Sequence, residues 1–64
     1  SSAKVKITGA TWSDSIVVLS NNYIYCFQKA NDIMPQHKLF IKDFLIEDLS
    51  TSSEQILFLI NKFG

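Results

Sequence analysis

The chain has 64 residues, which is enough for one small domain and too few for two. A hydrophobic content of 47% with 19% charged residues is typical of globular chains and excludes an intrinsically disordered one. Six basic and six acidic residues cancel, and this balance argues against nucleic acid or an anionic membrane as a partner held by net charge. We therefore expect residues 1–64 to form a single small domain or a fragment of a larger one.

Residues that usually support metal or cofactor chemistry are scarce. Cys26 is the only cysteine and His37 the only histidine, which excludes an internal disulfide and leaves too few ligands for a zinc site. We predict no cofactor and no small-molecule substrate. No signal peptide is visible, and no apolar run approaches the roughly 20 residues that span a bilayer. These observations predict an intracellular, cytoplasmic protein.

The first predicted strand is residues 4–8, in which polar and apolar side chains alternate (KVKIT). Its lysines favour an edge position, because charge on an outer strand discourages pairing with another chain. Lys4 and Lys6 are also the candidate contacts for an anionic lipid headgroup. Residues 1–3 are expected to be a frayed end or an expression remnant, and Gly9 ends the strand.

The connection at residues 10–14 contains the only tryptophan, Trp12. A tryptophan beside a loop usually packs in the core or covers it as a lid. The less common alternative is a binding platform, and Trp12 is a candidate interaction residue for that reason.

Residues 15–28 (SIVVLSNNYIYCFQ) are the stretch around which the rest of the chain is organised. Asn21 and Asn22 separate two β-branched and aromatic runs, and asparagine tolerates the positive φ that a two-residue type I′ turn requires. This turn fixes the register, so that each pair of opposite residues shares one face of the hairpin. One face has Val17, Leu19, Ile24 and Cys26. The other has Ile16, Val18, Tyr23, Tyr25 and Phe27.

Both faces of the predicted hairpin are apolar, which is unusual for a sheet with one side in water. More of this chain or a partner must therefore cover each face. We favour a central hairpin within the core, with Val17 and Leu19 buried there. The alternative is that Tyr23, Tyr25 and Phe27 form an interface with a partner. A stacking platform for nucleic acid is disfavoured, because clustered basic residues are missing around this row.

Residues 29–37 (KANDIMPQH) predict a loop, since asparagine and aspartate favour a turn and Pro35 biases the preceding residue toward an extended conformation. Ile33 and Met34 are apolar within this loop, so they either tuck back or are exposed for a partner. Met34 is therefore another candidate interaction residue.

The segment 38–49 (KLFIKDFLIEDL) is ambiguous. As a helix it would be apolar nearly all round, with no clean polar face. Its composition suits strands at residues 39–41 and 44–46, with Lys42-Asp43 as a bend or bulge between them. We therefore predict strands.

Residues 54–63 (EQILFLINKF) follow a polar break and are a second ambiguity. Thr51 and Glu54 have the spacing of a helix capping box, and the apolar residues that follow fall at helical spacing. Residues 55–60 also have the composition of a strand. These local signals favour a helix slightly and leave the strand open.

Two groupings bear on catalysis. Asp43, Glu47 and Asp48 could share a face for acid–base work, but a solvated edge or salt bridges to lysines are the simpler interpretation. Cys26 and His37 could form a nucleophile pair only if the fold brings them together. No oxyanion-hole motif is present, and we do not expect an enzyme.

The order of features from residue 15 to residue 63 resembles the middle of a pleckstrin-homology-like domain, in particular those that follow the catalytic module of Dbl-type exchange factors. The resemblance lies in the strand, tight turn and aromatic strand of residues 16–27, followed by residues 40–49 and 55–60. It implies an interaction module in which residues 55–60 form a strand. The pattern is also similar to that of a β-propeller fragment.

The chain departs from this family in two ways. The family's domains run to roughly a hundred residues and end in a long helix, for which only residues 54–63 are present here. Their phosphoinositide sites use clustered basic residues around the first two strands, where this chain has only Lys4 and Lys6. The resemblance therefore implies contact with protein rather than lipid.

Together these features predict a mainly β fold, an antiparallel sheet or partly open barrel built on the central hairpin, which becomes α+β if residues 54–63 are helical. The predicted role is a non-catalytic interaction module in intracellular signalling or scaffolding. Its partner would be a protein or, less favourably, anionic lipid headgroups. The alternative is a structural chain that completes the sheet or core of a larger complex or homo-oligomer. The candidate interaction residues are Trp12, Tyr23, Tyr25, Phe27 and Met34.

Overall fold

A computed structural model describes all 64 residues and shows a mainly β fold, as the sequence predicts. A single 3₁₀ turn, η1, is its only helical element, and no helix is long and apolar enough to cross a membrane. The elements in chain order are β1 (Ser2–Ile7), β2 (Ser13–Ser20), β3 (Tyr23–Phe27), β4 (His37–Phe40), η1 (Ile41–Asp43), β5 (Phe44–Asp48) and β6 (Ile56–Asn61).

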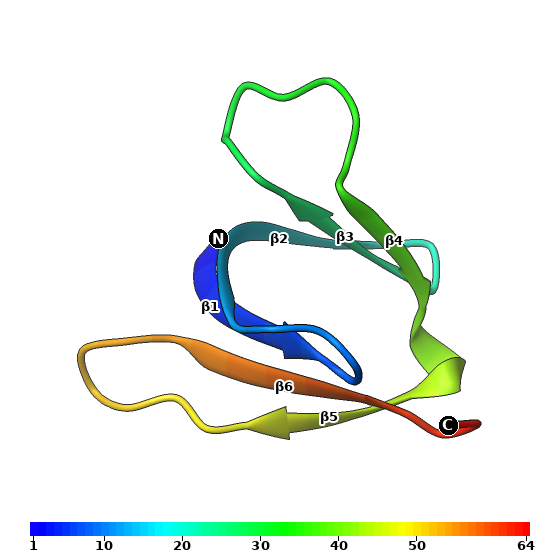
Figure 1. Ribbon diagram of the computed structural model, residues 1–64. Helices are drawn as coiled ribbons and strands as arrows, with labels where there is room; N and C mark the ends of the chain where they lie inside the picture. Colours follow the sequence, from blue (N-terminus) through cyan, green and yellow to red (C-terminus); the bar gives the residue numbers. More distant parts are fainter.

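The strands form one sheet in the order β4-β3-β2-β1-β6-β5. All neighbours are antiparallel except β1 and β6, which are parallel. Strand β2 joins two halves of the sheet, because residues 13–16 pair with β1 and residues 16–20 pair with β3. Figure 1 shows these halves turned relative to each other, with β3 and β4 on one side of β2 and β1, β6 and β5 on the other. The sheet is curled (Figure 1), and β4 and β5 are its two edge strands.

The central hairpin has the predicted turn and register. Asn21 and Asn22 have φ values of 52° and 71°, as a type I′ turn requires. Val17 lies opposite Cys26 and Leu19 lies opposite Ile24, in the predicted pairing. The turn residues therefore account for the register in which β2 pairs with β3.

The core is small and lies on the concave side of the curled sheet. Six of the 64 residues are buried: Ala3, Val5, Ser15, Ile24, Cys26 and Leu59. They come from β1, β2, β3 and β6, so the core depends on both halves of the sheet. Val17 packs against the core, as predicted, but Leu19 is 64% exposed, so its assignment to the core is wrong. Leu19 lies next to the turn, beyond the part of β2 that β1 covers.

The N-terminal strand differs from its prediction. Residues 2 and 3 are not frayed, because β1 begins at Ser2 and Ala3 is buried. The strand is also central rather than at an edge, with β2 on one side and β6 on the other. The lysines of β1 alternate with buried residues and lie on its outer face. Water can therefore reach their ammonium groups although β1 is a central strand.

Residues 56–61 form a strand, so the slight preference for a helix is wrong. Only half of the predicted capping box forms: the Glu54 N–H donates to Thr51 Oγ1 at 3.2 Å, whereas the Glu54 carboxylate pairs with the Lys4 ammonium. The chain then leaves this turn extended, because β6 pairs with β1 on one side and β5 on the other. Two ladders of backbone hydrogen bonds outweigh a local capping preference.

The ambiguous segment 38–49 forms strands, as predicted, with η1 as the bend between β4 and β5. The loop ahead of β4 is also present, and its Asp32 accepts a hydrogen bond from the Lys29 N–H at 3.0 Å. Figure 1 shows this loop extending away from the sheet. Trp12 is 44% exposed and lies outside the buried core.

Candidate functional site

Three aromatic rings and one lysine gather on the outer face of β3 and β4. The ring centroids of Tyr23 and Phe40 are 5.4 Å apart, and those of Tyr23 and Tyr25 are 6.2 Å apart. The Lys38 ammonium lies 4.5 Å from the centroid of Tyr23 and 5.9 Å from that of Tyr25. We call these four residues, with the neighbouring Val18, the aromatic patch.

The register of the sheet explains why these side chains meet. Tyr23 lies opposite Phe40 and Tyr25 lies opposite Lys38, while Val18 of β2 lies on the other side of Tyr25. Opposite residues share a face, so all five project from the outer face. The patch therefore depends on the type I′ turn and on the pairing of β3 with β4.

The patch is partly open to solvent. Its three rings are half-buried, Lys38 is exposed, and Val18 is 43% exposed. A lysine over aromatic rings contributes about 0.5–1 kcal/mol at an exposed site. The result is an ordered apolar surface with two phenol hydroxyls and one positive charge. Such a surface can contact apolar side chains and accept an anionic or polar group beside them.

Sequence reasoning identified part of this patch. It named Tyr23 and Tyr25, which the structure brings together, and Phe27, which lies on the same outer face opposite Ile16. It did not name Lys38 or Phe40. Both residues lie on β4, and the type I′ turn fixes only the pairing of β2 with β3, so finding them required knowing that β4 pairs with β3.

Trp12 belongs to a second cluster on a different part of the outer face. Its ring centroid lies 6.2 Å from that of Phe58, and the Lys6 ammonium lies 6.0 Å from the Phe58 centroid. An open hollow of about 430 Å³ lies beside Trp12, lined by Lys4, Trp12, Ser13, Asp14 and Ile56. Trp12 thus clusters with residues of β1 and β6, whereas the tyrosines cluster with residues of β3 and β4, so the two groups form separate surfaces.

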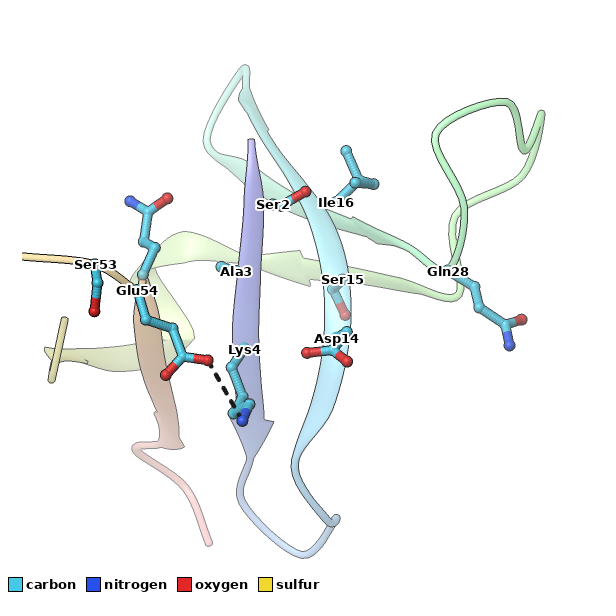
Figure 2. A pocket seen from close by; sticks show the side chains of 10 residues that line it. Ser2, Ala3, Lys4, Asp14, Ser15, Ile16, Gln28, Ser53 and Glu54 are labelled. Atoms are coloured by element: carbon cyan, nitrogen blue, oxygen red, sulfur yellow. Dashed lines mark ion pairs between the residues drawn. The ribbon is translucent and has the colours of Figure 1, made fainter. Parts of the chain in front are cut away.

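Lys4 has acidic neighbours. Its ammonium lies 3.5 Å from the Glu54 carboxylate, and its Cα is paired with that of Asp14 across the β1–β2 ladder. Figure 2 shows Lys4 and Glu54 pointing toward each other. They line an open hollow of about 390 Å³ whose other residues are mostly polar. The two carboxylates oppose the attraction of an anionic headgroup to Lys4.

The loop before β4 presents its apolar residues to solvent. Ile33 is 92% exposed and Met34 is 76% exposed, so neither tucks back onto the sheet. Met34 is therefore accessible to a partner, but it is not part of the aromatic patch.

The fold does bring Cys26 and His37 opposite each other on the concave face. Cys26 is only 1% exposed, and burial raises the pKa of its thiol. A raised pKa keeps the sulfur protonated near neutral pH, which is the reverse of what a nucleophilic cysteine requires. Cys26 thus acts as a small apolar residue of the core.

Comparison with protein-family models, with curated proteins and with solved structures finds no significant match to this chain.

Proposed function

We propose that this chain is a non-catalytic interaction module that binds a protein partner through the aromatic patch. The observation that supports this most directly is the cluster of Tyr23, Tyr25 and Phe40 with Lys38 over two of the rings. Tyrosine and phenylalanine are enriched at protein interfaces, where they provide a large contact area with few rotatable bonds.

The packing of the patch also favours binding. Its rings contact one another, so a partner would meet an ordered surface and little side-chain freedom would be lost on association. The tyrosine hydroxyls lie on the exposed side of a sheet and remain available to donate or accept hydrogen bonds. Both properties are typical of the residues that dominate binding energies.

The charge of the patch favours a protein over nucleic acid or lipid. Lys38 is the only charged residue among its five members, and a phosphate-rich partner normally meets several cations. A protein segment with apolar side chains beside one carboxylate would complement the rings and the ammonium together. Binding of anionic lipid headgroups through Lys4 and Lys6 is the weaker form of this proposal, given the carboxylate of Glu54 beside Lys4.

The resemblance to pleckstrin-homology-like domains is compatible with this role. That family implies a strand at residues 55–60, and β6 covers most of that range. Membership of the family and an intracellular role in signalling or scaffolding remain hypotheses that rest on the sequence pattern.

The test is binding with matched surface variants. Tyr25→Ser and Lys38→Gln alter the patch, whereas Leu19→Ser changes an apolar residue that is 64% exposed on the opposite face. Proteins captured by the wild-type chain are purified and their affinities for each variant measured by calorimetry. We expect the two patch variants to bind at least about tenfold more weakly, as for the loss of an interface hot spot. Leu19→Ser should bind like the wild type.

Circular dichroism of each variant shows whether the fold is retained. A purified partner that binds Tyr25→Ser and the wild-type chain equally well would refute the patch as the binding surface.

A second function is favoured by a different observation. The sheet ends in two unpaired edge strands, β4 and β5, and only six residues are buried. The chain would then be a structural piece that completes the sheet or core of a larger complex or homo-oligomer. Its association would use the backbone edges of β4 and β5, and β4 also carries Lys38 and Phe40 of the aromatic patch.

A further inference from the structure

Strand β4 has an unpaired edge whose hydrogen-bonding groups can be assigned. The Ile41 N–H donates to the Asn22 carbonyl at 2.8 Å. This hydrogen bond shows which residues of β4 direct their backbone groups toward β3 and which direct them away. Backbone groups alternate sides along an antiparallel strand. The N–H and C=O groups of Lys38 and Phe40 therefore point away from β3, toward the free edge.

Strand β5 has a matching edge at the other end of the sheet. The Leu49 N–H donates to the Ile56 carbonyl at 2.8 Å, so alternate residues of β5 face β6. The backbone groups of Ile46 and Asp48 consequently point outward. Ile46 is 46% exposed, so its side chain is also accessible beside this edge.

The two edges have opposite charges. Lys38 is the charged residue of β4, which contains no acidic residue. Glu47 and Asp48 are the charged residues of β5, which contains no basic residue. Asp48 is exposed and its carboxylate is ionised near neutral pH, and hydrogen bonding with Ser50, through its side chain and its backbone, lowers the pKa of this carboxyl further.

We propose that β4 of one copy of this chain adds antiparallel to β5 of a second copy, with Lys38 of the first opposite Asp48 of the second. The same register places Phe40 opposite Ile46, so a charged pair and an apolar pair form side by side. All four residues have backbone groups directed toward the new ladder. This inference rests on the second candidate function, and it identifies a second copy of the chain as the partner that pairs with the free strand edges.

Other pairings of the same edges are less favourable. Pairing β5 with a second β5 would gather four carboxylates at one contact. Pairing β4 with a second β4 would bring two lysines together. Like charges across a ladder are destabilising, whereas opposite charges stabilise it. The contact joins two different edges, so each copy keeps one free β4 edge or one free β5 edge for a further copy. Assembly can therefore continue beyond a dimer, unless the copies form a closed ring.

The test is the average mass in solution, measured by sedimentation over a range of concentrations at low salt. We expect the mass of the wild-type chain to rise with concentration and to fall when salt is added. Lys38→Glu or Asp48→Lys alone should weaken association about tenfold, since each replaces an attractive cross-strand pair with a repulsive one. The double variant Lys38→Glu/Asp48→Lys should regain it. The matched control is Lys6→Glu, which reverses a charge on the central strand β1 and should associate like the wild type, because other strands separate β1 from both edges.

Amide exchange provides the second measurement. At high concentration the N–H groups of Lys38, Phe40, Ile46 and Asp48 should gain protection, because they form the new ladder. A wild-type chain that stays monomeric at every concentration would overturn the inference, as would a double variant that associates no better than the singles. Such a result would leave the aromatic-patch proposal standing, since its test uses Tyr25→Ser and measures a different partner.

Discussion

The most direct test of the core is a pair of identical substitutions at two leucines that differ in burial. Leu59→Ala removes a side chain that is 1% exposed, between Ile7 of β1 and Ile46 of β5. Leu19→Ala removes a side chain that is 64% exposed next to the hairpin turn. The comparison separates the concave core from the end of the hairpin.

The expected magnitudes follow from the apolar groups that leave the protein interior. At about 0.8 kcal/mol per buried methylene, the three carbons lost from Leu59 account for roughly 2.4 kcal/mol. The remaining cavity raises the cost toward the usual range of about 2–5 kcal/mol. For Leu19, where about a third of the side chain is covered, the loss is below roughly 1 kcal/mol and water fills the space. Total stability for a chain of this size is only about 3–10 kcal/mol, so Leu59→Ala should be severely affected.

Urea unfolding followed by circular dichroism and by Trp12 fluorescence measures both variants. With a slope of about 1 kcal/mol per molar urea, Leu59→Ala should lower the midpoint by about 2 M or more, or leave the chain unfolded without urea. Leu19→Ala should lower it by less than about 1 M. Equal losses for the two variants, or a larger loss for Leu19→Ala, would refute the assignment of Leu59 to the core and Leu19 to the surface.

Three further predictions concern the turn, the buried thiol and the surface ion pair. Asn22 has a φ of 71°, which is costly for alanine, so Asn22→Ala should destabilise the chain by about 1 kcal/mol in urea unfolding. Asn22→Gly should be neutral or stabilising, because glycine adopts this φ without strain. Equal stability of the two variants would contradict the type I′ turn. Burial raises the pKa of the Cys26 thiol, so the thiol ionises at lower pH in the unfolded chain than in the folded one. The free energy of unfolding should therefore decline as the pH rises above the ordinary thiol pKa of 9.0, and it should decline less steeply for Cys26→Ala. Denaturant titrations that show the same pH dependence for both proteins would refute this prediction. Lys4 and Glu54 are about half exposed, so a double-mutant cycle with alanine should give a coupling below about 1 kcal/mol, and a larger value would mean that the pair is shielded from water.

Local sequence determines the hairpin and the bend. Asn21 and Asn22 accept positive φ, and a two-residue turn leaves one register for the strands on either side, so the pairing of Val17 with Cys26 follows from neighbours in the chain. The strands on each side of η1 were also predictable, because a helix over the same residues would have had no polar face. The tyrosines of the aromatic patch were found for the same reason, since turn geometry places them on one face.

Tertiary structure decided the rest, because the deciding contacts join residues far apart in the chain. Residues 56–61 have helical spacing and a local cap at Thr51, yet they are extended because β1 supplies a parallel neighbour from the other end of the chain. The same pairing makes β1 central despite its lysines and orders Ala3 in the core. Leu19 alternates along β2 so that it points to the same face as the core residues, but it lies beyond the part of β2 that pairs with β1. Parity along a strand is a local property, whereas burial depends on which distant strand covers that position.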